Sequence, residues 1–188
     1  MPLPELKTGV VLLAAGQGKR FGGSKLSAEF HGRPLWERAA ETAEAIDFIE
    51  RIVVIGPDSP IKSRVGWMRV ENQLAENGMG TSIAAGVCAL ADCDQVIIML
   101  ADMPLVSGAH LDRLIETKGM AFTRYPDGSA GCPAIFPRSA FKKLEGLTGE
   151  QGARSLDLGE PILVSPPDWR ELADVDTVRD LEILATEP

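Results

Sequence analysis

Three short segments of this chain, residues 8–14, 51–55 and 95–100, are almost continuously apolar. A strand that faces water on one side alternates apolar and polar residues, whereas a strand covered on both sides does not need to alternate. The three segments therefore predict the central strands of a sheet with helices on both faces. Because helical stretches separate them, the sheet should be mostly parallel and the fold class α/β, a Rossmann-like three-layer sandwich.

The periodicity of the remaining apolar residues indicates helices between these strands. Pro34, a residue type favoured in the first turn of a helix, precedes a stretch in which Leu35, Trp36, Ala39, Ala40 and Ala43 share one face. Residues 120–136 instead break into short strand-like pieces around a turn sequence, which predicts antiparallel strands late in the sheet. Further helices are expected over residues 81–90, 107–118 and 176–185.

The length of the chain fits one globular domain, which we expect to span residues 1–188. No apolar run approaches the roughly 20 residues of a membrane-spanning helix, and residues 1–5 lack the pattern of an export signal. The three cysteines include no C-x-x-C pair, so we expect reduced thiols and a cytoplasmic location. A formal net charge of -8 disfavours nucleic acid as a partner and indicates a small anionic ligand held by local cations.

A glycine-rich loop, residues 14–25, follows the first predicted strand. Its four glycines let backbone amides approach a phosphate, and its three cations, Lys19, Arg20 and Lys25, can supply charge-assisted hydrogen bonds. Ligands of open α/β sheets bind beyond the carboxyl ends of the strands, which is where this loop begins. We interpret it as a phosphate-binding loop; the alternative is a surface loop with solvated charges.

Two familiar phosphate-binding motifs are not met by this loop. The dinucleotide fingerprint G-x-G-x-x-G needs one residue fewer between its second and third glycines, here Gly18 and Gly22. A Walker loop needs Ser or Thr after its Gly-Lys pair, where this chain has Arg20. The sequence therefore favours neither of these two nucleotide-binding classes.

Carboxylates follow one central strand and precede the last predicted helix. Asp102 comes just beyond residues 95–100, at the sheet edge where the glycine-rich loop is also expected, and it is a candidate Mg²⁺ ligand. Its alternative role is to begin the turn before Pro104. Asp174 and Asp176 stand before the last helix, where an acidic residue or a threonine usually caps the first turn. The residues alone leave metal binding and capping both open.

The pattern Leu13-Ala14-Ala15-Gly16-x-Gly18-x-Arg20-x-Gly22-x-x-Lys25, followed by Gly32-x-Pro34-Leu35, resembles the signature of the MobA-like nucleotidyltransferases. That family includes the molybdenum-cofactor cytidylyl- and guanylyltransferases. The resemblance implies a fold of the nucleotide-diphospho-sugar transferase type. It also implies catalytic roles for Arg20 and Lys25 on the triphosphate and for Asp102, with Asp102 and Asp176 as the metal ligands. The nucleotide-binding residues implied are Ala14, Ala15, Gly16, Gly18, Arg20, Gly22, Lys25, Ser82 and Ala101.

Later segments resemble the molybdopterin cytidylyltransferase branch of this family. Residues 78–82 imply that Ser82 contacts the base, although a serine at a helix start is also a typical capping residue. Residues 131–137 and 149–154 resemble segments of the same branch and imply acceptor binding by Gly131, Pro133 and Arg154. The chain departs from the branch at Met103, where glutamine is common, and at residues 26–30.

The residues and the resemblance together predict an Mg²⁺-dependent nucleotidyltransferase. It would transfer CMP from CTP to a phosphorylated acceptor, molybdopterin, and release pyrophosphate, with a recipient molybdoenzyme as a further partner. An acceptor phosphate is already ionised at neutral pH, so neither a protein nucleophile nor a general base is required. The alternatives are a GTP-using guanylyltransferase or a methylerythritol-phosphate cytidylyltransferase of the same fold, a sugar-phosphate nucleotidyltransferase, and a non-catalytic domain that binds a nucleotide or cofactor as a chaperone.

Overall fold

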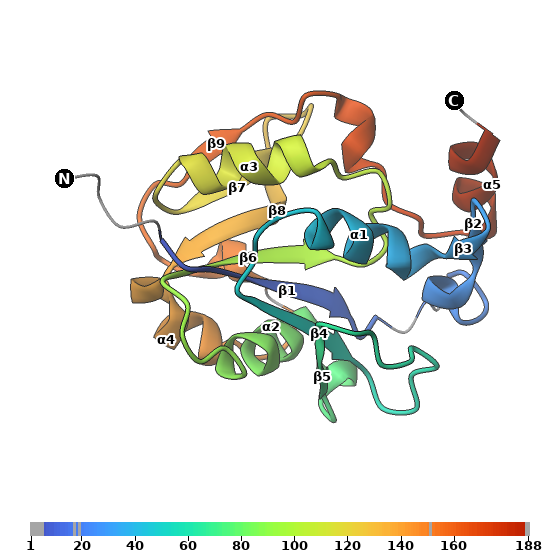
Figure 1. Ribbon diagram of the computed structural model, residues 1–188, viewed down its shortest axis with the longest axis horizontal. Helices are drawn as coiled ribbons and strands as arrows, with labels where there is room; N and C mark the ends of the chain where they lie inside the picture. The colour runs from blue at the N-terminus through green and yellow to red at the C-terminus, as the bar shows by residue number, and fades with distance from the viewer. Residues whose placement is uncertain (1–5, 17, 19, 151, 187–188) are drawn as a thin grey trace.

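The computed structural model describes residues 6–16, 18, 20–150 and 152–186. Residues 1–5, in which the sequence shows no export-signal pattern, lie outside it. Within the described residues, seven strands form one sheet in the order β5-β4-β1-β6-β8-β7-β9 (Figure 1). A separate short hairpin joins β2 and β3. The strands are β1 (Thr8–Ala14), β2 (Glu29–Phe30), β3 (Arg33–Pro34), β4 (Glu50–Ile55), β5 (Met68–Glu71), β6 (Gln95–Leu100), β7 (Ala121–Arg124), β8 (Ala130–Pro137) and β9 (Ile162–Val164).

The sheet has a parallel half and a mixed half. β1 pairs in parallel with β4 and β6, and β5 extends this half beyond β4. On the other side β8 is antiparallel to β6 and to β7, and the edge strand β9 is parallel to β7. The turn between β7 and β8 is closed by a hydrogen bond from the Gly128 N–H to the Tyr125 carbonyl at 2.9 Å. The predicted late antiparallel strands are therefore confirmed.

Helices cover both faces of the sheet, which makes the three-layer sandwich that the apolar segments predicted (Figure 1). Alternation along β1 divides the core between the faces: Val10 and Leu12 pack with α1 and α3, whereas Val11 and Leu13 pack with α2 and α4. The helices are α1 (Leu35–Glu44), α2 (Met79–Cys88), α3 (Gly108–Glu116), α4 (Phe141–Glu145) and α5 (Val178–Thr186). None of the described helices is long and apolar enough to cross a membrane.

A glycine lets α2 lie close to the centre of the sheet. A Cβ atom added at Gly86 would stand 2.4 Å from Val11 Cγ1 and 2.9 Å from Val54 Cγ2, distances that real Cβ atoms do not adopt. The helix also begins two residues earlier than the sequence predicted, at Met79 rather than at residue 81. Thr81 and Ser82 consequently lie in its first turn, at the end of the sheet that carries the glycine-rich loop.

His110 in α3 is fully buried, and its hydrogen bonds identify its neutral tautomer. Thr123 donates its hydroxyl hydrogen to the Pro133 carbonyl at 2.7 Å, so the His110 Nε2, 2.7 Å from that hydroxyl, must be the donor to it. The other ring nitrogen, Nδ1, has no hydrogen-bond partner. Burial lowers the pKa of His110, Arg113 lowers it further, and Glu171 opposes this shift.

We expect the free energy of unfolding to fall as the pH drops below 6.5, the ordinary pKa of histidine. Below pH 6.5 the unfolded chain binds a proton on His110 and the folded chain does not, so the free energy of unfolding falls by up to about 1.4 kcal/mol per pH unit. Above that pH the contribution of His110 is constant. Urea titrations between pH 7.5 and 5 should show a shallower decline for His110→Gln than for the wild type. His31→Asn, at the exposed second histidine, is the control, and an identical decline in all three proteins would contradict the expectation.

Candidate active site

The glycine-rich loop lies at the carboxyl ends of the two central strands β1 and β6, as the sequence predicted. The Ala101 N–H donates to the Leu13 carbonyl at 3.1 Å, which holds the two strand ends side by side. Gly18 and Gly22 have φ angles of 57° and 77°, in the left-handed region that glycine enters without strain. The loop ends in a single 3-10 turn, Lys25–Ser27, so Lys25 starts from ordered backbone. Lys19, the third predicted cation, lies outside the described residues.

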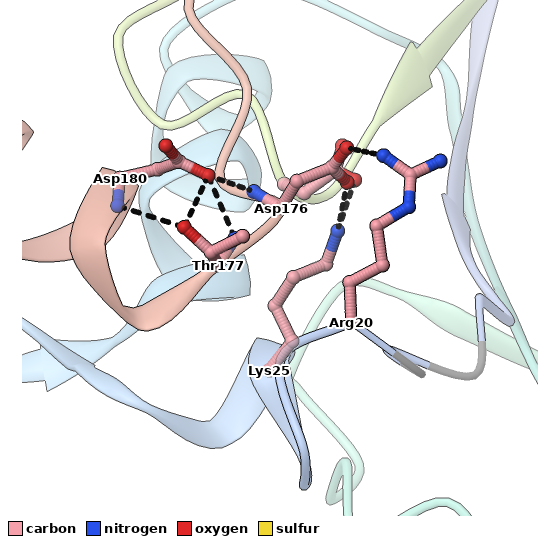
Figure 2. A network of polar contacts seen from close by, with 6 residues as sticks. Arg20, Lys25, Asp176, Thr177 and Asp180 are labelled. Carbon is pink, nitrogen blue, oxygen red and sulfur yellow. Dashed lines mark hydrogen bonds and ion pairs between the residues drawn. The ribbon is translucent and has the colours of Figure 1, made fainter.

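Two cations of this loop face two carboxylates. Lys25 Nζ lies 2.7 Å from Asp102 Oδ2 and 3.4 Å from Asp176 Oδ1, and Arg20 Nη1 lies 2.6 Å from Asp176 Oδ2. Figure 2 shows the Arg20 and Lys25 side chains converging on Asp176 from the loop. Only 10 % of the Lys25 side chain is exposed, whereas 78 % of Arg20 is, so the lysine pairs are the less screened.

Asp176 is free to face these cations because Thr177 caps α5. The Asp180 N–H lies 3.2 Å from Thr177 Oγ1, and Asp180 Oδ2 accepts from the backbone N–H groups of both Asp176 and Thr177 (Figure 2). This reciprocal arrangement is a capping box. The buried Val175 donates its N–H to the Asp102 carbonyl at 3.0 Å and thereby ties the two acidic segments together. The capping alternative thus applies to Thr177, and the last helix begins at Val178 rather than at Asp176.

The carboxylates fit a magnesium ion that is shared with a phosphate ligand. Asp102 Oδ1 is buried and has no hydrogen-bond partner, and Asp102 Oδ2 and Asp176 Oδ1 both contact the Lys25 ammonium, so a positive group lies between them. No group of three potential His, Cys, Asp or Glu ligands occurs in the described part of the chain. Magnesium needs only one or two carboxylates when phosphates and waters complete its shell. Burial, and then the charges of Asp176 and Asp102, raise the pKa of the nearby Asp174.

A cleft of about 440 Å³ opens beside the ion pairs. It adjoins a second cleft of about 550 Å³, and the two share the glycine-rich loop, Lys25 and Glu76 as walls. Ala101 is buried behind these walls and lines neither cleft. The predicted residues that line the first cleft are Ala15, Gly16, Gly18, Arg20, Lys25, Ser82, Asp102 and Asp176, while Ala14 and Gly22 line the second.

A third cavity of about 310 Å³ lies under β8 and shares Met79 and Leu100 with the first cleft. Two of the three predicted acceptor residues, Gly131 and Arg154, line it, and Arg154 Nη1 donates to the Ala130 carbonyl at 2.6 Å. The third, Pro133, is buried within β8 and does not line the cavity. Most other walls are apolar, including Ile83, Ile98, Phe122 and Phe136.

The sequence assigned no site role to Glu76, Met79 and Glu150, which also line the first cleft, although the last two lie in the segments 78–82 and 149–154. Glu150 reaches the cleft because residue 149 lies against the start of α2: the Gly80 N–H donates to the Gly149 carbonyl at 2.9 Å. Gly78, with φ at 119°, makes this approach possible, because a Cβ atom there would stand 2.4 Å from the Gly149 carbonyl. Gly78 and Gly149 are the sequence signal for this close approach, but a single sequence does not show which of its glycines lie against each other.

Known proteins resemble this chain in sequence and in fold. The family model described as MobA-like NTP transferase domain matches residues 10–160. The purine catabolism protein PucB of Bacillus subtilis is 29% identical over 93% of this chain and 94% of its own length. The nicotine blue oxidoreductase of Paenarthrobacter nicotinovorans is 29% identical over 91% of this chain and 93% of its own length. The crystal structure of Rv0371c from Mycobacterium tuberculosis superposes with a TM-score of 0.81 at 24% identity, covering 98% of this chain and 100% of Rv0371c. A second structure of Rv0371c, in complex with manganese, superposes with a TM-score of 0.78 at 22% identity and covers 98% of this chain and 100% of Rv0371c.

Proposed function

Because the chain belongs to the MobA-like NTP transferase family, and is thus a nucleotidyltransferase, we propose that it transfers CMP from CTP to a phosphorylated acceptor and releases pyrophosphate. One observation carries the proposal: the loop cations Arg20 and Lys25 meet Asp102 and Asp176 at the mouth of the cleft beyond β1 and β6. Nucleotidyl transfer needs these parts together, namely cations for the phosphates and carboxylates for a metal ion. Asp176 lies beyond the matched residues 10–160, so we propose that the functional domain extends through α5.

In the proposed reaction an acceptor phosphate oxygen attacks the α-phosphorus of CTP. A new phosphorus–oxygen bond forms, the bond between the α-phosphorus and the bridging oxygen breaks, and pyrophosphate leaves with the electron pair. Lys25 and Arg20 bind phosphate oxygens and offset the charge that moves onto the leaving group. Mg²⁺, held by Asp102 and Asp176, would add its positive charge at the phosphates. The manganese complex of Rv0371c, which has this fold, supports a divalent metal ion in this role.

We propose that the acceptor occupies the third cavity, with molybdopterin as the acceptor and a molybdoenzyme as the recipient of the product. The cavity joins the nucleotide cleft at Met79 and Leu100, has mainly apolar walls and carries Arg154, a phosphate-binding residue type, at its lining. Apolar walls can pack against a flat ring system, and Arg154 can bind a phosphate. The names of PucB and of the nicotine blue oxidoreductase refer to other processes, so the support for this acceptor is the resemblance at residues 131–137 and 149–154.

We expect CTP to stabilise the protein more than GTP does, in the presence of Mg²⁺. A ligand at ~100 times its dissociation constant adds about 2.7 kcal/mol to stability, which for a chain of this size raises the melting temperature by roughly 5–10 °C. A thermal-shift series with CTP, GTP, UTP and ATP measures this. Equal or larger stabilisation by GTP would contradict the cytidylyl assignment.

Pyrophosphate release then tests the transfer itself. We expect release from CTP and Mg²⁺ only when molybdopterin is present. If CTP binds but no pyrophosphate is released with any of three acceptors, namely molybdopterin, methylerythritol phosphate or a sugar phosphate, the result would favour a non-catalytic nucleotide-binding domain.

A further inference from the structure

A buried amide, Asn72, lies behind the wall of the 440 Å³ cleft. Asn72 follows β5, is 6 % exposed, and donates its backbone N–H to the Ile55 carbonyl at the end of β4, at 2.8 Å. Its side chain reaches the first turn of α2, where Nδ2 lies 2.8 Å from Thr81 Oγ1 and 3.0 Å from Ser82 Oγ. Asn72 itself does not line the cleft, but Ser82 does.

The orientation of the Asn72 amide follows from a backbone contact. Asn72 Oδ1 lies 2.9 Å from the Leu74 nitrogen, and a backbone N–H can only donate. The side-chain atom at that position must therefore be the carbonyl oxygen, which leaves the two Nδ2 hydrogens for the two hydroxyls. Thr81 and Ser82 thus both accept a hydrogen bond from Asn72.

The two hydroxyls differ in where their own hydrogens can go. Thr81 Oγ1 has two carbonyl acceptors, those of Leu74 at 2.9 Å and Gly78 at 2.8 Å. For Ser82 none of the described residues accepts the hydroxyl hydrogen, although Ser82 is only 5 % exposed. Since one lone pair of Ser82 Oγ is engaged by Asn72, the O–H group remains available as a donor toward the cleft that Ser82 lines.

We propose that Asn72 is a positioning residue that fixes Ser82 as a hydrogen-bond donor to the nucleobase. The inference rests on the proposed function, in which the nucleotide occupies this cleft. The base edge that meets Ser82 must present an acceptor, either a carbonyl oxygen or an unprotonated ring nitrogen. Cytosine offers two adjacent acceptors of this kind, O2 and N3. On the corresponding edge of guanine only O6 accepts, and N1 and the N2 amino group carry hydrogens; a Ser82 donor that faces O2 and N3 of cytosine would meet these hydrogens in guanine, so Asn72 selects against guanine through Ser82.

The first test compares Ser82→Ala, Asn72→Asp and the double variant by titration calorimetry with Mg²⁺, using CTP and inorganic tripolyphosphate as ligands. Aspartate keeps the shape of asparagine and still accepts from the Leu74 N–H, but it would also accept the Ser82 hydrogen and so reverse that hydroxyl. We expect each single variant to bind CTP about tenfold more weakly, the effect of one lost hydrogen bond, and the double variant to lose no more. Tripolyphosphate, which has no base, should bind Ser82→Ala as tightly as the wild type, and the double variant as tightly as Asn72→Asp, because the members of each pair carry the same charge.

Two results would overturn this proposal. If Ser82→Ala weakens the binding of tripolyphosphate as much as the binding of CTP, Ser82 merely supports the loop structure. If the two losses multiply in the double variant, Asn72 does not act through Ser82. CTP binding by a wild type that transfers CMP to no acceptor contradicts the proposed function instead and leaves these comparisons valid.

A second test does not depend on the folding of Asn72→Asp. It uses 2-thio-CTP, whose sulfur is a weak acceptor at position 2, and 3-deaza-CTP, which lacks the N3 acceptor. We expect at least one analogue to bind the wild type about tenfold more weakly than CTP and to bind Ser82→Ala as well as CTP does. The proposal fails if both analogues match CTP on the wild type, or if the penalty persists unchanged in Ser82→Ala.

Discussion

Asp102→Asn is expected to lower the rate of nucleotidyl transfer by about a hundred- to a thousandfold, or roughly 3–4 kcal/mol, the typical effect of one lost electrostatic element in an active site. Asparagine keeps the shape of the side chain but removes the negative charge that a metal ion requires. The same change breaks the ion pair with Lys25, in which 23 % of the Asp102 side chain and 10 % of Lys25 are exposed. We therefore also expect a loss of about 1–2 kcal/mol in stability.

Both effects should be measured on one preparation, as melting temperature and as transfer rate per folded molecule. Asp112→Asn on α3, at an exposed carboxylate distant from the cleft, is the matched control and should change neither. If Asp102 only begins the turn before Pro104, the variant will melt earlier yet transfer CMP at the wild-type rate once folded. That outcome would remove Asp102 from the metal site.

Lys25→Met should lower kcat/KM for CTP by about a hundredfold and raise KM while lowering kcat, because a cation on the phosphates acts in both the ground state and the transition state. Methionine retains the apolar stem of lysine and removes only the charge. Without nucleotide the variant should also melt earlier than the wild type, because Asp102 and Asp176 lose the ammonium group between them. Mg²⁺ alone should then raise its melting temperature more than that of the wild type.

Lys142→Met on α4 makes the same chemical change at an exposed lysine and should leave kinetics and melting unaltered. Wild-type kinetics for Lys25→Met would show that this lysine does not contact the triphosphate. An equal response of variant and wild type to Mg²⁺ would show that Lys25 does not shield the two carboxylates.

The sequence predicted the sheet well because its signals are local. The segment 95–100 became β6 without a change of boundary, and the turn at 125–128 joins the antiparallel pair β7 and β8. Helix starts were less accurate, since capping depends on which side chain turns back to the backbone. At the start of α5, the sequence did not separate Asp176 from Thr177; the capping box of Thr177 with Asp180 and the tertiary contact of Asp176 with Arg20 separate them.

For the candidate site, residue types at strand ends predicted that the loop cations and Asp102 lie at one edge of the sheet, because every strand end in the parallel half opens on that edge. The sequence did not show that Lys25 pairs with Asp102, nor that Asn72 stands behind Ser82. The first contact joins residues 77 positions apart, and the second joins the residue after a strand to the first turn of a helix. Their chemistry is plain from the residue types, but their distances depend on the packed fold.

The ion pair between Arg20 and Asp176 joins residues 156 positions apart. A ribosome releases the amino-terminal part of a chain first, so the loop emerges well before its carboxylate partner. The strands of the large sheet end at Val164, so the loop cations and every strand of that sheet precede Asp176 in the chain. A chain that ended after Val164 would keep Arg20 and Lys25 but lack Asp176, one of the two carboxylates of the proposed metal site. In the proposed function, catalytic competence therefore depends on the last segment to be synthesised, which also carries the buried core residues Leu172 and Val175.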